Sequence, residues 1–131
     1  MILGIDPGTR KCGYAVMGKL GEPPATIGIV DTPSLRAIVD ELLRAYPIAV
    51  IALGSGTHAP PVAAQLARCG VPVRVVDEHE TTLRARARYF DDHPPRGWKR
   101  WVPRGMLLPP RPIDDYAALL IAERLAAVVT P

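Results

Sequence analysis

Two short apolar runs in the middle of the chain, residues 48–53 and 71–76, most strongly limit how it can fold. Both runs are bounded by proline or glycine, and both are predicted to be strands buried on the two faces of a sheet. Apolar residues at helical spacing precede and separate them. Such alternation implies parallel strands joined by crossover helices, so the chain is predicted to be an α/β protein.

The segment before these runs predicts three further strands, at residues 2–5, 13–17 and 25–30. Turn signals separate these strands, so they are expected to form an antiparallel meander. A helix is then expected from near Ser34 to just before Pro47. Later helices are expected at residues 61–68, 81–90 and 113–129. The whole chain, 1–131, is therefore predicted to be one domain with a mixed five-stranded sheet and helices on both faces.

Residues 93–112 interrupt this alternation. The segment is rich in proline, glycine and arginine, and it contains Trp98 and Trp101. Proline blocks helix interiors and removes hydrogen-bond donors from central strands. A long basic surface loop is therefore predicted here.

The composition suits one folded domain that has an anionic partner. Apolar residues make up 48% of the 131 positions, which is enough for one core, and the formal net charge is +3. The chain shows no secretory signal, and no apolar run approaches the roughly 20 residues that cross a bilayer. A cytoplasmic location without membrane contact is therefore expected.

The two cysteines, Cys12 and Cys69, stand alone without the CxxC spacing of a structural zinc site. A reduced state is the simplest interpretation, and either residue could serve as a small buried hydrophobe. The cysteines therefore point to no metal chemistry.

Three acidic side chains stand where the predicted elements end or begin. Asp6 follows the first strand, Glu78 follows the run at 71–76, and Asp114 opens the last helix beside Asp115. Taken singly, each fits a plain role, because aspartate is common in Asp-Pro-Gly turns and acids are favoured at helix starts. Carboxylates that converge from strand ends and a helix are also what a divalent-metal site for phosphate chemistry needs. The joint pattern favours such a site.

The chemistry predicted for this site is phosphodiester hydrolysis with two divalent ions. Asp6, Glu78 and Asp114 are the predicted catalytic residues and metal ligands, and Asp6 would bridge Mg²⁺ or Mn²⁺ ions about 4 Å apart. Asp115 is a candidate outer ligand. His79 is either a proton shuttle or a solvated histidine at a helix start.

Small and basic residues around these acids are candidates for holding a nucleic acid. The predicted contacts are Thr9, Arg10, Lys11, Ser55, Thr57, Thr82, Arg86, Trp98, Lys99, Arg100 and Trp101. Ser55 and Thr57 belong to a glycine-rich loop that fits a phosphate or a plain flexible turn equally well. In the loop around Trp98, cations alternate with tryptophans, which suits phosphates and stacked bases. The alternative is that the tryptophans pack the loop onto the core.

Three motifs together resemble the YqgF (RuvX) family, in the RuvC-like branch of the ribonuclease H-like fold. They are GIDPGTR at 4–10, VDEHETT at 76–82 and IDDYAA at 113–118. The resemblance implies a metal-dependent nuclease that acts on RNA, with the ends of ribosomal RNA precursors as the implied substrate. The chain departs from the family at His79, where an arginine is usual, and at Ala117, where related junction resolvases have a second aspartate.

Two other functions stay open at this stage. A Holliday junction resolvase acting on branched DNA would need a two-fold homodimer to cut symmetric strands, and single-stranded DNA is a further candidate substrate. A module that binds nucleic acid without cleaving it is the non-enzyme alternative, although retention of all three acids argues against it. Half of an actin-like ATPase is excluded by length, because that scaffold closes two such domains around its nucleotide.

Overall fold

The computed structural model describes residues 1–77, 81–94, 97 and 113–129, without the side chains of residues 81–83, 128 and 129. The strands are β1 (Ile2–Asp6), β2 (Lys11–Met17), β3 (Thr26–Asp31), β4 (Val50–Gly54) and β5 (Val73–Val76). A 3₁₀ turn (Thr32–Ser34) leads into the helices, which are α1 (Leu35–Ala45), α2 (Ala59–Gln65), α3 (Thr81–Asp92) and α4 (Asp114–Val129). The predicted order of strands and helices is confirmed.

The five strands form one mixed sheet in the order β3-β2-β1-β4-β5. β1, β2 and β3 pair antiparallel, whereas β1, β4 and β5 run parallel. The register places Asp6 opposite Gly13 and Gly54 beside Val76. The carboxyl ends of the three parallel strands therefore lie together at one end of the sheet, which is where open α/β sheets place their sites.

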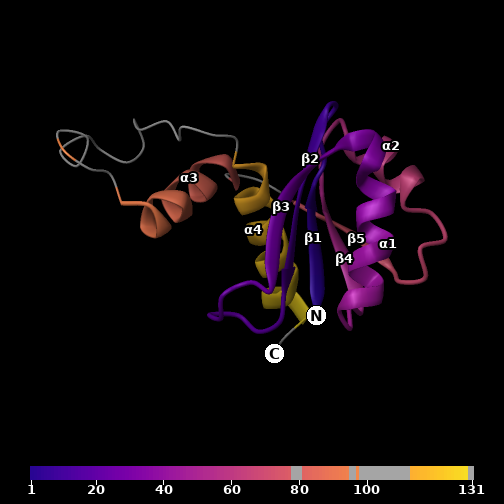
Figure 1. Ribbon diagram of the computed structural model, residues 1–131, viewed down its shortest axis with the longest axis horizontal. Coiled ribbons are helices and arrows are strands. Elements are labelled where there is room, and N and C mark those ends of the chain that lie inside the picture. The colour runs from indigo at the N-terminus through magenta and orange to yellow at the C-terminus, as the bar shows by residue number, and fades with distance from the viewer. Residues whose placement is uncertain (78–80, 95–96, 98–112, 130–131) are drawn as a thin grey trace.

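Helices cover both faces of the sheet, as predicted (Figure 1). Successive residues of a strand point to opposite faces, so β1 supplies two cores. Leu3 and Ile5 join the core that contains Leu35 of α1, whereas Ile2 joins the core that contains Ile121 of α4. α3 packs on α4 rather than on the sheet, and it projects away from the rest of the domain in Figure 1.

α4 lies directly against the sheet because two glycines face it. A side chain at Gly4 would overlap the carbonyl oxygen of Ala118, and a side chain at Gly13 would overlap the carbonyl oxygen of Asp114. The Gly4 position also meets Ala122, whose Cβ would lie 2.8 Å from an added Cβ. Small residues on both elements therefore bring the first turn of α4 over the end of β1.

β5 corrects one prediction. The run at 71–76 is expected to be buried on both faces, but β5 is an edge strand and Val75 is 61% exposed. Among the described strands only β4 pairs with it, so the other side of β5 has no sheet partner within the described residues. Val76 is buried against α4, whereas on the other face Val73 is only partly buried against the core that contains Leu35, and Val75 is exposed.

The helix boundaries follow local signals. α2 begins at Ala59, earlier than predicted, because Pro60 and Pro61 fit the first turn of a helix. Backbone N–H groups in the first turn have no partner within the helix, so the missing N–H of proline costs nothing there. α2 ends at Gln65, and Arg68 beyond it adopts a left-handed backbone angle, with φ of 60°. Among the described helices, none has the length and apolar character needed to cross a membrane.

Candidate functional site

Asp6 and Asp114 line one cleft of about 560 Å³ at the end of the sheet. Asp6 is the last residue of β1 and Asp114 is the first of α4. Gly13 lies opposite Asp6 in the sheet and admits the backbone of Asp114, so it brings the two acids to the same place. The cleft is lined by Asp6, Pro7, Gly8, Arg10, Lys11, Asp31 and Asp114.

The charge on Asp114 is the clearest electrostatic feature of this cleft. Burial raises the pKa of its carboxyl above the ordinary value of 3.8; the nearby charge of Asp115 raises the pKa as well, while Lys11 lowers it. Asp115 is buried, and its Oδ1 accepts a hydrogen bond from the Tyr116 amide at 3.0 Å. Two adjacent acids thus concentrate negative charge at the start of α4, and Lys11 offsets only part of it.

We expect Asp114→Asn to stabilise the metal-free protein near neutral pH. A carboxyl whose pKa is raised on folding stabilises the folded state below its unfolded pKa, and this contribution is lost as the pH rises through the folded pKa. The uncharged amide avoids that loss, so the variant should gain over the wild type only above pH 3.8. Urea unfolding in EDTA at about pH 3 and pH 7 tests this. An equal difference at both pH values would show that the charge is not the cause.

The turn after Asp6 is fixed from the β3 side of the sheet. Thr32 Oγ1 donates a hydrogen bond to the Gly8 carbonyl at 2.9 Å, and it lies 3.3 Å from Cys12 Sγ. Cys12 is fully buried, and both cysteines are free thiols in the structure. These contacts hold the backbone of the turn in place just before Arg10 and Lys11.

Two residues at this end of the molecule were not candidates from the sequence. Asp31 lines the cleft and lies opposite Lys11 in the β2–β3 register, but in the sequence it indicates only a helix start. His58 lies beside Thr9, with its ring nitrogens 3.1 and 3.2 Å from Thr9 Oγ1. This contact joins the turn after β1 to the loop after β4, and no local sequence signal marks it.

Three other residues predicted to contact nucleic acid, Ser55, Thr57 and Arg86, do not line the cleft. The Ser55 amide donates to the Val76 carbonyl at 2.8 Å, so this amide is used by the sheet, whereas the role of the Ser55 hydroxyl remains a prediction. Thr57 is exposed in the loop before α2, and Arg86 is half-buried on α3. Neither residue lines the cleft.

Several predictions fall outside the described residues. Glu78 and His79 lie there, and so do the predicted contacts of the basic loop, Trp98, Lys99, Arg100 and Trp101. Thr82 lies in α3, but its side chain is not described. The roles of these residues remain predictions.

The donors of the cleft fit a divalent cation. Carboxylate oxygens such as those of Asp6 and Asp114 are the hard ligands that Mg²⁺ and Mn²⁺ prefer. Burial and the charge of Asp115 raise the pKa of Asp114, and a cation bound in the cleft would favour the charged form of this carboxyl. Within the part of the chain that the structure describes, no three His, Cys, Asp or Glu side chains are grouped closely enough to hold a metal ion. The third predicted ligand, Glu78, lies outside that part.

Comparison with known proteins identifies the fold. No model of a known protein family matches the sequence, and no curated protein sequence matches it. T. thermophilus RuvC in complex with a Holliday junction substrate is 22% identical, with a TM-score of 0.60, and another Thermus thermophilus RuvC structure is 20% identical, with a TM-score of 0.56. Each comparison covers 98% of this chain and 96% of the other. The likeness confirms the predicted ribonuclease H-like fold.

Proposed function

We propose that this protein is a divalent-metal-dependent nuclease that hydrolyses phosphodiester bonds. The proposal is carried by the convergence of Asp6 and Asp114 on one cleft, next to Arg10 and Lys11. The two carboxylates can bind a divalent metal ion, and the side chains of Arg10 and Lys11 beside them can bind the phosphates of a nucleic acid. The similar fold of RuvC in complex with a Holliday junction substrate supports a nucleic-acid substrate.

Each residue of the cleft has a separate role in this proposal. Asp6 and Asp114 would hold Mg²⁺ or Mn²⁺ with Glu78 as the third ligand, and Asp115 is the candidate outer ligand next to Asp114. When bound, the ions supply an activated water and charge stabilisation at the leaving oxygen. Lys11 binds a phosphate oxygen and also limits the repulsion between the acids. β1 and α4 orient the carboxylates, so little rearrangement is needed when the substrate binds.

RNA is the substrate that we propose first, in particular the ends of ribosomal RNA precursors. The support for RNA is the resemblance of the three acidic motifs to those of the YqgF family. The competing substrate is a Holliday junction, which is favoured by the complex in which the similar RuvC was solved. Symmetric cleavage of a junction needs a two-fold dimer, so the oligomeric state also bears on this choice.

Cleavage assays with Mn²⁺ on labelled single-stranded RNA, single-stranded DNA and a four-way junction, run side by side, test the proposal. We expect cleavage of at least one substrate, and its loss when EDTA removes the metal. Preference for RNA would support the first assignment, whereas symmetric cuts in the junction by a dimer would support the second. Binding without cleavage of any substrate would contradict the nuclease proposal and leave a binding module.

A further inference from the structure

The turn between β1 and β2 forms one side of the cleft, and the ladder between these two strands does not extend into it. Residues 7–10 form this turn, with Asp6 just before it and Lys11 just after it. The register of the two strands ends where Asp6 lies opposite Gly13. The positions of both charged side chains therefore depend on contacts that reach the turn from other elements.

Thr32, just after β3, holds this turn at two points. Its Oγ1 donates a hydrogen bond to the Gly8 carbonyl oxygen at 2.9 Å, and its amide donates to the Arg10 carbonyl oxygen at 2.9 Å. Because a carbonyl oxygen only accepts, the hydroxyl hydrogen of Thr32 is committed to Gly8, and the thiol of Cys12 is the donor in its 3.3 Å contact with Thr32 Oγ1. Both contacts with the turn are to backbone oxygens, so Thr32 fixes the path of the chain.

Gln65, the last residue of α2, holds Thr32 from the other side. Its Nε2 donates to the Thr32 carbonyl oxygen at 3.0 Å, and its Oε1 accepts from the Arg36 amide at 2.8 Å. Nη1 of Arg36 donates in turn to the Gln65 carbonyl oxygen at 2.9 Å, which joins the start of α1 to the end of α2. A chain of hydrogen bonds therefore runs from these two helices to the turn beside the cleft.

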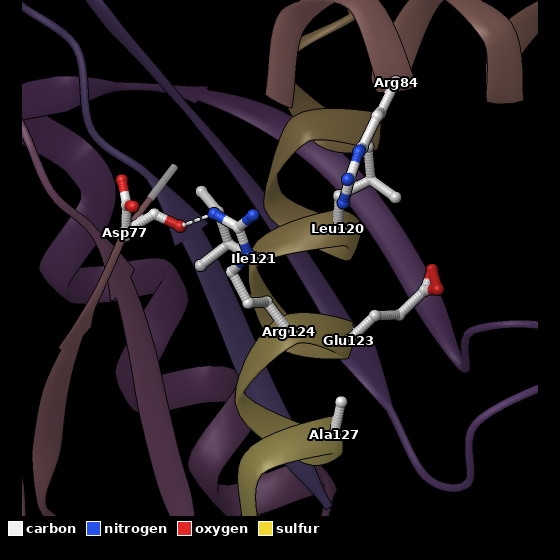
Figure 2. A pocket seen from close by; sticks show the side chains of 7 residues that line it. All are labelled: Asp77, Arg84, Leu120, Ile121, Glu123, Arg124 and Ala127. Atoms are coloured by element: carbon white, nitrogen blue, oxygen red, sulfur yellow. Dashed lines mark hydrogen bonds between the residues drawn. The ribbon is translucent and has the colours of Figure 1, made fainter. Parts of the chain in front are cut away.

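The end of β5 is held in a comparable way. Nη1 of Arg124 on α4 donates a hydrogen bond to the carbonyl oxygen of Asp77, the residue that precedes Glu78 in the sequence (Figure 2). Here too, a side chain from a neighbouring element holds the end of a strand through a backbone oxygen. A contact of this kind does not use a carboxylate, so it can orient the end of a strand without competing with a cation for its ligands.

We propose that Thr32 is a positioning residue for the metal site at Asp6 and Asp114, acting through the turn that ends at Lys11. The inference rests on the proposed function in taking these two acids to bind a divalent cation. It goes beyond that function because it assigns a role to a residue that does not line the cleft. Thr32 is expected to affect how tightly the metal ion binds, but not how tightly nucleic acid binds in the absence of metal.

Loss of the Thr32 hydroxyl would release the turn at Gly8. The Thr32 amide would still donate to Arg10, so the turn would keep one of the two contacts. Asp6 lies two residues before Gly8, and its carboxylate would be less well ordered before a cation binds. Residues that support metal ligands typically contribute about 10- to 100-fold to metal affinity or activity, and an effect through the backbone belongs at the lower end of this range.

Mn²⁺ titration of the Thr32→Val variant, without nucleic acid, tests this proposal. Valine keeps the shape of the side chain and removes the donor. Mn²⁺ broadens the NMR signals of nearby groups, so the amide signals of Lys11 and Asp114 report binding in the cleft. Thr32→Val is expected to need about 10-fold more Mn²⁺ for half-maximal broadening, and its cleavage at limiting Mn²⁺ should slow by a similar factor. Nucleic-acid binding in EDTA should change less than about 2-fold.

Three further variants show whether the hydroxyl is the cause. Thr32→Ser retains the hydroxyl and should stay within about 2-fold of the wild type in Mn²⁺ binding. Thr26→Val makes the same substitution at the other end of β3 and is the matched control, which should behave like the wild type. Gln65→Glu keeps the acceptor for Arg36 but loses the donor to Thr32, so it should also need more Mn²⁺. This last variant leaves Thr32 intact and decides the matter if Thr32→Val does not fold.

The outcomes separate this inference from the proposed function. If Thr32→Val binds Mn²⁺ like the wild type, or if Thr32→Ser is as impaired as Thr32→Val, the hydroxyl does not position the site. Failure of the wild type to bind Mn²⁺ in the cleft would overturn the inference as well. Equal cleavage by the wild type and Thr32→Val at limiting Mn²⁺ would overturn this inference and leave the nuclease proposal standing. Thr32-dependent Mn²⁺ binding without cleavage of any substrate would support this inference and contradict only the nuclease proposal.

Discussion

Asp6→Asn is expected to abolish metal-dependent cleavage while leaving substrate binding nearly unchanged. The amide keeps the shape of the side chain at the end of β1 but removes the negative charge that, in the proposed mechanism, would hold a cation opposite Asp114. Changes to groups that only support metal ligands already cost about 10- to 100-fold, so loss of a ligand should cost at least about 100-fold in rate. Binding should change less than about 2-fold, because the cations of the cleft remain.

Single-turnover cleavage and binding in EDTA, measured on the same preparations, would separate these effects. Glu41→Gln is the matched control, because it removes a carboxylate from the exposed surface of α1. It should retain wild-type rates. If the Asp6→Asn variant cleaves at the wild-type rate, a metal mechanism centred on Asp6 is ruled out.

The order of strands and helices can be predicted from the sequence because apolar runs, turn residues and prolines indicate where each element begins and ends. Asp6 is predictable as a strand end, since four apolar residues precede it and a Pro-Gly turn follows. Asp114 is predictable as a helix start, since Pro112 precedes it and small apolar residues follow. Parallel strands joined by helices then place these two ends on the same side of the sheet. The positions of Asp6 and Asp114 in the cleft both follow from such local signals.

The features that the sequence does not reveal depend on partners distant in the chain. Asp31 reaches the cleft only because β3 pairs with β2 in a register that sets it opposite Lys11. His58 meets Thr9 across two loops that are joined only by the fold. The prediction of burial on both faces is wrong for β5 because an apolar run indicates that a segment is hydrophobic but not whether the strand lies in the centre or at the edge of the sheet.

Gly13→Ala is expected to cost both stability and activity, although alanine is the smallest possible addition. An added Cβ would overlap the Asp114 carbonyl and lie 2.7 Å from the Asp115 amide nitrogen. These are backbone atoms of α4, so no side chain can rotate away, and the helix itself must move. Overpacking of this kind typically costs about 1–3 kcal/mol, and the backbone contact places Gly13→Ala near the upper limit.

Thermal unfolding followed by circular dichroism, together with the cleavage assay, tests whether the protein needs glycine at position 13. Gly18→Ala is the matched control, because the nearest atom to its added Cβ is the flexible Cε of Met1, at 3.9 Å. Gly13→Ala should unfold at a clearly lower temperature than Gly18→Ala and should cleave more slowly even where it remains folded, since Asp114 moves with α4 relative to Asp6. If the two variants melt alike and cleave alike, the close contact between β2 and α4 does not hold the two carboxylates together, and another contact must set their spacing.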